Sequence, residues 1–445
     1  MAILAISGVG VLTLLVRESA SAEVAAGPAY TLVPDDGLTR EVEAPVTPAA
    51  ELDLPAPGRF VAPFWAAPAE FETPAPVAAP AAAPAATPES FSLFLPTALR
   101  DYIPPPRQPE PFLAVAEPGD GEWPAEAPAM SFSRVGLHAL GPQDPFIIEF
   151  IRRAKPRVVK SVGFFEFLAE VKQISPGTVT IGRIIGQDES LVSVQDPAEA
   201  AAAYLQANLA TYQANPAVDY WEGWNEYVYT SFDQLRWYAA FEAARACQMQ
   251  AAGFRAAVGG FAVGWPNGYP EMELFLPALE AAYNCDGLFH LHEYNRPLLQ
   301  CAVQTDKAGL IPGAPALRVP AGPLTFRYRF WYEGLLKPHG LGDLPLVLSE
   351  YGIDAVPAIA CPDPVLDGRT WKSYGSWWPE QGFGVDGPSA YVNQLAWADR
   401  EMRHDPYVIG ATVFTAGAVN GDSQWNPHDI HDVLKPLARY LISQH

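Results

Sequence analysis

Two glutamates end apolar stretches of this chain in settings suited to acid–base chemistry. Glu226 lies in YWEGWNEY (220–227), and Glu350 ends LPLVLSE (344–350). A glutamate in a buried apolar strand is costly unless it has a partner or a chemical task. Two carboxylates that flank a sugar C–O bond are the recurring solution for glycoside hydrolysis. One must be protonated to donate to the leaving oxygen, and the other must be ionised to attack the anomeric carbon.

The neighbouring residues in the sequence indicate which glutamate is the protonated one and which is the ionised one. Glu226 is flanked by three aromatic residues: Trp221, Trp224 and Tyr227. Apolar walls disfavour a charged carboxylate, so we expect Glu226 to be the proton donor. Tyr294 can reach Glu350 from a neighbouring strand, and hydrogen bonds to a carboxylate keep it charged. We therefore expect Glu350 to be the nucleophile.

Eight short apolar runs must position these residues, and they alternate with helical stretches. The runs are 134–140, 158–163, 179–185, 220–226, 256–264, 287–295, 344–352 and 408–417. Strands that alternate with helices pair in parallel through right-handed crossovers. Eight such units in about 310 residues predict an α/β fold of the (β/α)8 barrel type. An open doubly wound sheet is the alternative, but LHALGPQDP after the first run is no Gly-rich phosphate turn.

Polar residues gather toward the carboxyl ends of these runs. The first run carries His138, the third Arg183, and the sixth His292 and Tyr294. Barrel enzymes place their catalytic groups at the carboxyl ends of the strands. We therefore expect these residues to line one site with the two glutamates, and Arg183 to lie near the nucleophile.

Three motifs carry a resemblance to a known family. WEGWNE resembles the W-E-x-W-N-E acid/base strand of the clan A superfamily of retaining glycoside hydrolases, which are (β/α)8 barrels. VLSEYG resembles the nucleophile segment on that clan's seventh strand, and HEY at 292–294 is similar to its H-x-Y on the sixth. The resemblance implies a two-glutamate double displacement on an oligo- or polysaccharide, without a cofactor, mostly at β-linked sugars or α-linked arabinose.

The resemblance also implies roles for single residues. Glu226 would be the acid/base, and Glu350 would be the nucleophile. Asn225 would bind a sugar 2-hydroxyl, Tyr294 would hold the nucleophile, and His292 would line the site. Glu222 matches a structural glutamate lower in the fourth strand. One departure is visible, because the clan usually has proline after N-E and this chain has Tyr227.

Tryptophans after the strand ends are candidates for stacking on sugar rings. We favour Trp265 after the fifth strand and Trp378 in the long insert 353–386, and we include Trp425 after the eighth strand. Long loops of this kind are usually functional. Loop tryptophans also serve simply to anchor loops in the core.

Two other functions fit parts of the sequence. A catalytically inactive carbohydrate-binding barrel would keep the fold and the aromatic platforms. A metal-dependent barrel hydrolase would use His290 and His292, which lie on one face of a strand. Barrel metallohydrolases usually carry their H-x-H on the first strand, where this chain has only His138, so we expect no metal site.

The first 130 residues differ in composition from the rest. Residues 1–16 are almost all apolar, and Ala20 and Ala22 form a small-x-small cleavage pattern, so we assign 1–22 to a signal peptide or a signal anchor. Residues 1–130 hold 22 of the 46 prolines, with 17 Asp+Glu against 5 Lys+Arg. We expect 23–130 to be a mostly disordered, acidic Pro/Ala-rich linker. The catalytic domain is then 131–445, secreted or held at the cell surface by a membrane tether.

The net charge limits the classes of partner that we expect, and the cysteines predict a disulfide rather than a zinc site. The formal net charge of -22 argues against nucleic acid and against an anionic membrane surface. A neutral carbohydrate fits better, and we expect a monomer. The four cysteines show no zinc spacing, and Cys301 with Cys361 is the expected disulfide because both lie in Pro-rich loops.

Overall fold

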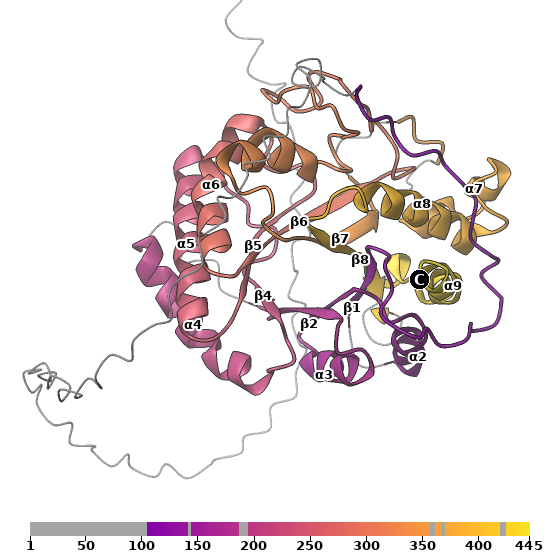
Figure 1. Ribbon diagram of the computed structural model, residues 1–445, viewed down its shortest axis with the longest axis horizontal. Coiled ribbons are helices and arrows are strands. Elements are labelled where there is room, and N and C mark those ends of the chain that lie inside the picture. The colour runs from indigo at the N-terminus through magenta and orange to yellow at the C-terminus, as the bar shows by residue number, and fades with distance from the viewer. Residues whose placement is uncertain (1–104, 141–143, 187–194, 357–360, 366–369, 419–423) are drawn as a thin grey trace, which may run out of the picture. The chain divides into compact units, whose positions relative to one another are not determined.

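The strands of this computed structural model close into a single barrel. It describes residues 105–140, 144–186, 195–356, 361–365, 370–418 and 424–445. Eight parallel strands run in sequence order around the barrel (Figure 1). They are β1 (Val135–Ala139), β2 (Val158–Val162), β3 (Val179–Arg183), β4 (Tyr220–Glu222), β5 (Ala256–Phe261), β6 (Leu288–Asn295), β7 (Leu346–Ile353) and β8 (Val408–Ala416). Each predicted run overlaps one of these strands, which confirms the (β/α)8 barrel.

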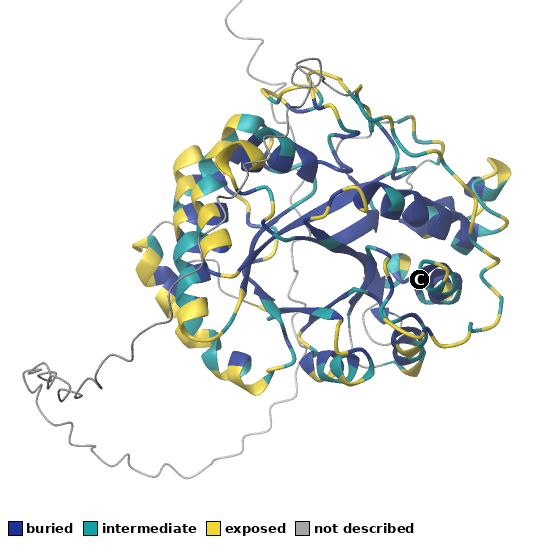
Figure 2. Cartoon of the chain, in the orientation of Figure 1, coloured by how far each residue is buried: buried dark blue, intermediate teal, exposed yellow. Residues whose placement is uncertain are grey.

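The strands are buried, as is most of the helix Gly387–Met402, whereas an outer face is exposed on most of the helices that cover the barrel (Figure 2). They are α2 (Pro145–Ala154), α3 (Phe165–Ile174), α4 (Pro197–Ala214), α5 (Phe232–Ala251), α6 (Tyr269–Asn284), α7 (Trp377–Glu380), α8 (Gly387–Met402) and α9 (Leu434–Ile442). After β6 the chain forms a π-helix, η1 (Phe330–Leu336). The described residues also form short 3-10 helices: η2 (Lys337–His339), η3 (Trp371–Tyr374), η5 (Asn426–His428) and η6 (His431–Val433).

Local sequence explains where several helices begin and end. Three helices follow an aspartate whose side chain accepts backbone N–H bonds in the first turn: Asp144 before α2, Asp196 before α4 and Asp386 before α8. Such caps satisfy donors that have no partner within the helix. Gly253 follows α5 with φ of 86°. Glycine adopts this left-handed conformation without steric cost.

The inside of the barrel has an apolar floor and a charged layer above it. The floor is a cluster of buried residues: Val158, Ile181, Ala257, Leu288 and Val347. Side chains two residues apart on a strand share a face. Two residues beyond Val158, Ile181 and Leu288 stand Lys160, Arg183 and His290, and Glu222 ends β4 at the same level. Alternation along the strands therefore builds the charged layer.

An irregularity in β7 turns two consecutive residues inward. Its register with β8 shifts between Leu348 and Tyr351. The Ser349 hydroxyl lies 2.9 Å from His290 Nδ1, and the Glu350 carboxylate lies 3.2 Å from Lys160 Nζ, so both side chains face the interior. Regular alternation would have placed one of them outside. Bulges that re-aim a side chain next to a site are common.

Residues 105–130, which we call the strap, belong to the barrel rather than to a free linker. They run along the outside of α8, α9 and α2 (indigo in Figure 1). The strap is held by side chains from all three helices: Glu401, Asn393, Trp397 and Asp386 from α8, Arg439 from α9, and Arg153 from α2. The expected boundary at residue 130 therefore lies too far along the chain. The remainder of the expected linker and the signal segment fall outside the described residues.

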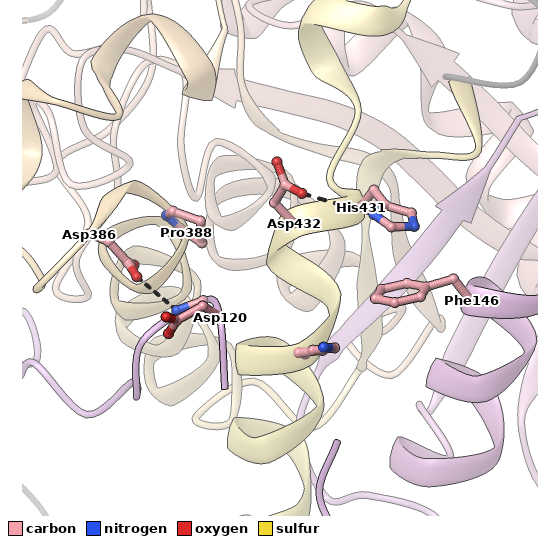
Figure 3. Close-up of a pocket in the computed structure, with 8 residues that line it drawn as sticks. Asp120, Phe146, Asp386, Pro388, His431 and Asp432 are labelled. Carbon is pink, nitrogen blue, oxygen red and sulfur yellow. Dashed lines mark hydrogen bonds and ion pairs between the residues drawn. The ribbon is translucent and has the colours of Figure 1, made fainter. Parts of the chain in front are cut away.

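A pocket of about 510 Å³ marks the place where the strap meets the helices (Figure 3). It is lined by Gly119, Asp120, Phe146, Asp386, Pro388, His431, Asp432 and Lys435. Gly119 N donates to Asp386 Oδ2 at 2.8 Å, and the Phe146 and His431 rings stack at 3.9 Å. Both candidate catalytic glutamates are absent from the lining, so this hollow is separate from the catalytic site.

Two disulfides fasten the surface of the barrel. Cys301 and Cys361 join the loops after β6 and β7, as predicted. Cys247 on α5 pairs with Cys285, which follows α6. Within the described part of the chain, no helix combines the length and the apolar character needed to cross a membrane.

Two truncations test the strap. Removing residues 1–104 should leave the melting temperature of the barrel unchanged. Removing residues 1–130 should destabilise it by about 2 kcal/mol or more, because Glu401 and Asn393 lose several hydrogen bonds worth roughly 1 kcal/mol each. Thermal unfolding followed by circular dichroism measures both. Equal melting temperatures for the two truncated proteins would show that the strap only rests on the surface.

Candidate functional site

Glu226 stands at the barrel mouth, just beyond β4. The strand ends at Glu222, and Glu226 adopts φ of 50° while its backbone N–H donates to Gly260 O at 2.9 Å. A positive φ is uncommon for a glutamate and is often found at functional sites. Its side chain is 36% exposed, and His292 Nδ1 lies 2.7 Å from Oε1. Glu226 is therefore open to solvent on one side and fixed by a histidine on the other.

The aromatic wall that we expected around Glu226 is not there. Trp221 packs edge-on against Phe165 of α3, and Trp224 stacks on Phe241 of α5 at 4.3 Å. Tyr227 packs on Tyr238, also of α5. These rings point outward to the helices, because the apolar core of a (β/α)8 barrel lies between strands and helices as well as inside the barrel. Glu226 shares its surroundings with polar groups instead.

Glu350 is buried, and each of its two oxygens has its own partners. Oε1 lies 3.2 Å from Lys160 Nζ, 3.1 Å from Arg183 and 3.8 Å from His138 Nε2. Oε2 accepts a hydrogen bond of 2.9 Å from the Tyr294 hydroxyl and lies 3.5 Å from His292 Nδ1. The predicted contact with Tyr294 and the predicted proximity of Arg183 are both present.

These partners decide the charge of Glu350. Burial alone would raise its pKa, but electrostatic interactions with His292, Lys160 and Arg183 together outweigh burial and hold the pKa well below the ordinary value. Glu350 is thus a carboxylate at any pH near neutrality. Burial and the Glu350 charge also raise the pKa of Tyr294 well above its usual value, so Tyr294 stays a hydrogen-bond donor.

The two glutamates face each other across the site. One carboxylate oxygen of Glu226, one of Glu350 and one ring nitrogen of His292 all lie within 4.8 Å of one another. His292 Nδ1 is close to Glu226 Oε1 and to Glu350 Oε2, which puts Oε2 on the side that faces Glu226. The opposite oxygen, Oε1, points to Lys160 and Arg183. Oε1 is therefore held by Lys160 and Arg183, and Oε2 is held by the Tyr294 hydroxyl on the side toward Glu226.

A second buried carboxylate lies beneath Glu350. Glu222 Oε2 is 2.9 Å from Lys160 Nζ, and Oε1 is 3.4 Å from His290 Nδ1. Burial would raise the pKa of Glu222, but Lys160 leads the cationic groups that lower it to about 2. Burial lowers the pKa of His290 to about 3, against the influence of Glu222, so His290 is neutral.

Lys160 is the residue that sequence reasoning missed. It is fully buried on β2 and lies between Glu222 and Glu350. A signal was present, since a lysine in the middle of the apolar run VVKSV must find a partner or a task. Its partners are on β4 and β7, however, and only the closed barrel brings them together.

Arg183 links Asn225 to Glu350. The guanidinium donates to Asn225 Oδ1 and to Glu350 Oε1. Asn225 itself is exposed at the mouth of the barrel, next to Glu226. Asn225 and Glu350, rather than an ion pair with Glu226, hold Arg183 in place.

His138 lies on the β1 side of Glu350. It is fully buried, and Nδ1 is 3.1 Å from the Thr415 hydroxyl. Burial and the charge of Lys160 hold its pKa well below the usual value, although Glu350 acts in the opposite direction. A neutral imidazole therefore packs beside Glu350.

The three candidate tryptophans lie in different environments. Trp378 is fully buried, stacks on Tyr391 and donates to Pro297 O at 3.0 Å, so it anchors a loop and offers no face to a sugar. Trp265 is partly exposed after β5 and packs edge-on against Tyr229. Trp425 is partly exposed and packs edge-on against Phe414, which itself adjoins Tyr294.

A metal ion would have to compete with fixed positive charges at this site. The spacing of Glu226, His292 and Glu350 is one that an ion could use. Lys160 and Arg183, however, already neutralise Glu350 within 3.2 Å, and a divalent cation there would be repelled by both. His290, the partner of His292 in the metal hypothesis, is instead engaged with Ser349 and Glu222.

Comparisons with known proteins give distant structural likenesses. No protein-family model matches the chain, and no curated protein matches it. Among solved structures it is similar to the endoglucanase Cel5A of Pseudomonas stutzeri, at 14% identity and a TM-score of 0.40 over 71% of this chain and 97% of that one. It is also similar to the family 30 xylanase Xyn30A of Clostridium acetobutylicum, at 9% identity and a TM-score of 0.37 over 71% and 73%. At such identities and TM-scores these likenesses fix neither substrate nor reaction.

The depressed pKa of Glu222 makes stability depend on pH. A carboxyl with a folded pKa of about 2, against the ordinary 4.5, stabilises the fold fully above pH 4.5 and loses this contribution as pH falls through 2. The contribution is about 3 kcal/mol. Glu222→Gln should therefore flatten the fall in the free energy of unfolding between pH 6 and pH 2.5, measured by urea denaturation. Glu280→Gln, on the exposed face of α6, is the control, and a wild-type slope in Glu222→Gln would refute the assignment.

Proposed function

We propose that this chain is a retaining glycoside hydrolase that acts on an oligo- or polysaccharide by a double displacement. One observation carries the proposal. The carboxylates of Glu350, on β7, and Glu226, just beyond β4, come within 4.8 Å, the first held ionised by buried cations and the second partly open to solvent. Retaining enzymes keep their carboxyl groups about 5–5.5 Å apart, whereas inverting enzymes need about 6.5–9.5 Å for a water molecule.

The first step forms a glycosyl-enzyme. Glu350 Oε2 attacks the anomeric carbon, the bond to the leaving oxygen breaks, and the proton of Glu226 passes to that oxygen. Oε1 stays bound to Lys160 and Arg183, which fixes the direction of the attacking oxygen. A preorganised group of this kind needs little rearrangement as charge develops in the transition state.

The second step regenerates the enzyme. Glu226, now ionised, takes a proton from water, the water oxygen bonds to the anomeric carbon, and the ester to Glu350 breaks. Negative charge moves from Glu350 to Glu226 and back, so the net charge of the site stays constant through the cycle. His292 lies between the two carboxylates and can hydrogen-bond to either.

We also propose that the protein works in an oxidising compartment outside the cytosol. Two disulfides fasten the described part of the chain. Disulfides persist in secreted and cell-surface proteins and are rare where thiols are kept reduced. The apolar segment at residues 1–16 supplies a signal or anchor for export.

A covalent trap tests the nucleophile and the acid/base separately. Incubation with a panel of activated 2-fluoroglycosides should label Glu350, and peptide mapping should recover the tag on the peptide that contains β7 (Leu346–Ile353). Glu350→Gln should lose turnover by about 10⁴-fold or more and take up no tag, because the covalent step needs its carboxylate.

The variant Glu226→Ala tests the acid/base role of Glu226 separately from the role of Glu350. It should retain labelling by sugars with good leaving groups, accumulate the intermediate, and regain turnover with azide, which needs no general base.

The outcomes discriminate among the candidate functions. Product of retained anomeric configuration, seen by proton NMR, supports the double displacement, and inverted product rules it out. Binding of glycans without turnover or labelling by the wild type would identify a carbohydrate-binding barrel. Activity lost to a chelator and restored by zinc would favour the metal-dependent hydrolase.

A further inference from the structure

We propose that Lys160 and Glu222 act as a pair of positioning residues that sets the charge and orientation of Glu350 from beneath. This inference rests on the proposed function and adds two residues that do not touch the substrate. Lys160 Nζ stands 2.9 Å from Glu222 Oε2 and 3.2 Å from Glu350 Oε1. A single ammonium group thus bridges two carboxylates.

The bridge is built from buried groups. The side chains of Lys160, Glu222 and Glu350 are 0%, 1% and 9% exposed. Desolvation makes each charge expensive on its own, so the three charges depend on one another. Lys160 also stands directly above Val158 of the apolar floor, which leaves its ammonium group no route to solvent. Because Lys160 is buried at this position, its ammonium group fixes how far along the barrel axis the Glu350 carboxylate lies.

Charged and titratable groups surround Glu350 from several strands of the barrel. They are His138 on β1, Lys160 on β2, Arg183 on β3, Glu222 and Glu226 on and after β4, and His292 and Tyr294 on β6. Arg183 alone could keep Glu350 ionised, and it lies closer to the mouth. Lys160 differs because it shares its charge with a second carboxylate.

That sharing gives Glu222 an influence on the nucleophile. With Glu222 ionised, Lys160 is divided between two anions and binds Glu350 less strongly. If Glu222 were neutral, the whole ammonium charge would act on Glu350 and make it a weaker nucleophile. If Lys160 were removed, Glu350 would face the unpaired negative charge of Glu222. Changes at the two positions therefore shift the protonation of Glu350 in opposite directions.

The pH dependence of kcat/KM tests this opposition. Lys160→Met should move the acid limb upward by about 1 to 3 pH units, the size expected for loss of an opposite charge at this distance. Glu222→Gln should leave the acid limb at or below its wild-type position and lower kcat. The double variant Lys160→Met/Glu222→Gln should fall between the wild type and Lys160→Met, because it lacks both the ammonium and the unpaired carboxylate.

Controls separate this role from a structural one. Lys172→Met removes a lysine of another ion pair, with Asp219 at the other end of the barrel, and should leave the profile unchanged. If Lys160→Met does not fold, the double variant is compared with Glu222→Gln, and an upward shift of about one pH unit is still expected. A uniform loss of kcat with unchanged acid limbs in all variants would overturn the proposal.

A second readout does not depend on catalysis. The pH titration of the Glu350 carboxyl carbon is followed by ¹³C NMR, and its resonance is assigned by its absence in Glu350→Gln. The titration midpoints of the variants should follow the same order as their acid limbs. The measurement needs no enzymatic activity. The two hypotheses can then fail separately. Absence of turnover and labelling would remove the hydrolase proposal alone, whereas equal Glu350 midpoints with and without Lys160 would remove this one alone.

Discussion

The site depends on one constraint: a carboxylate buried in the barrel must stay ionised. Desolvation opposes this, and the fold answers with Lys160 and Arg183, both within 3.2 Å of Glu350 Oε1. Tyr294 holds the other oxygen. The charged layer requires a dry floor below it and strands from around the barrel to supply its members. The apolar cluster beneath Lys160 and the closed sheet provide both.

The contrast between the two glutamates follows from their places on the strands. Glu350 is on β7 itself, where an irregular register turns it inward beside Ser349. Glu226 lies beyond the end of β4 in a left-handed backbone conformation, and its side chain reaches the mouth of the barrel. One carboxyl is therefore buried among cations, and the other meets solvent and a single histidine. A division of acid–base roles needs such a difference in environment.

The outside of the barrel contributes through packing rather than chemistry. The tryptophans at 221 and 224 pack into the aromatic core between the strands and helices α3 and α5. Their bulk fixes the β4 backbone, and thereby the position of Glu226 a few residues later. The strap and the Cys301–Cys361 disulfide hold the helices and loops on other sides of the barrel. Residues remote from the site thus contribute to its geometry.

The sequence alone determined the fold class, since eight apolar runs that alternate with helical stretches admit few topologies. It also determined that Glu226 and Glu350 stand near strand ends, together with His138, Arg183, His292 and Tyr294, because strand position follows from local pattern. It misjudged Trp378 as a platform and the aromatic residues as a wall around Glu226. In both cases side-chain direction depends on the neighbouring helices, which pattern does not specify. Tertiary structure alone decided the role of Lys160, whose partners lie 62 and 190 residues further along the chain. Charges so far apart in sequence meet only because the barrel closes.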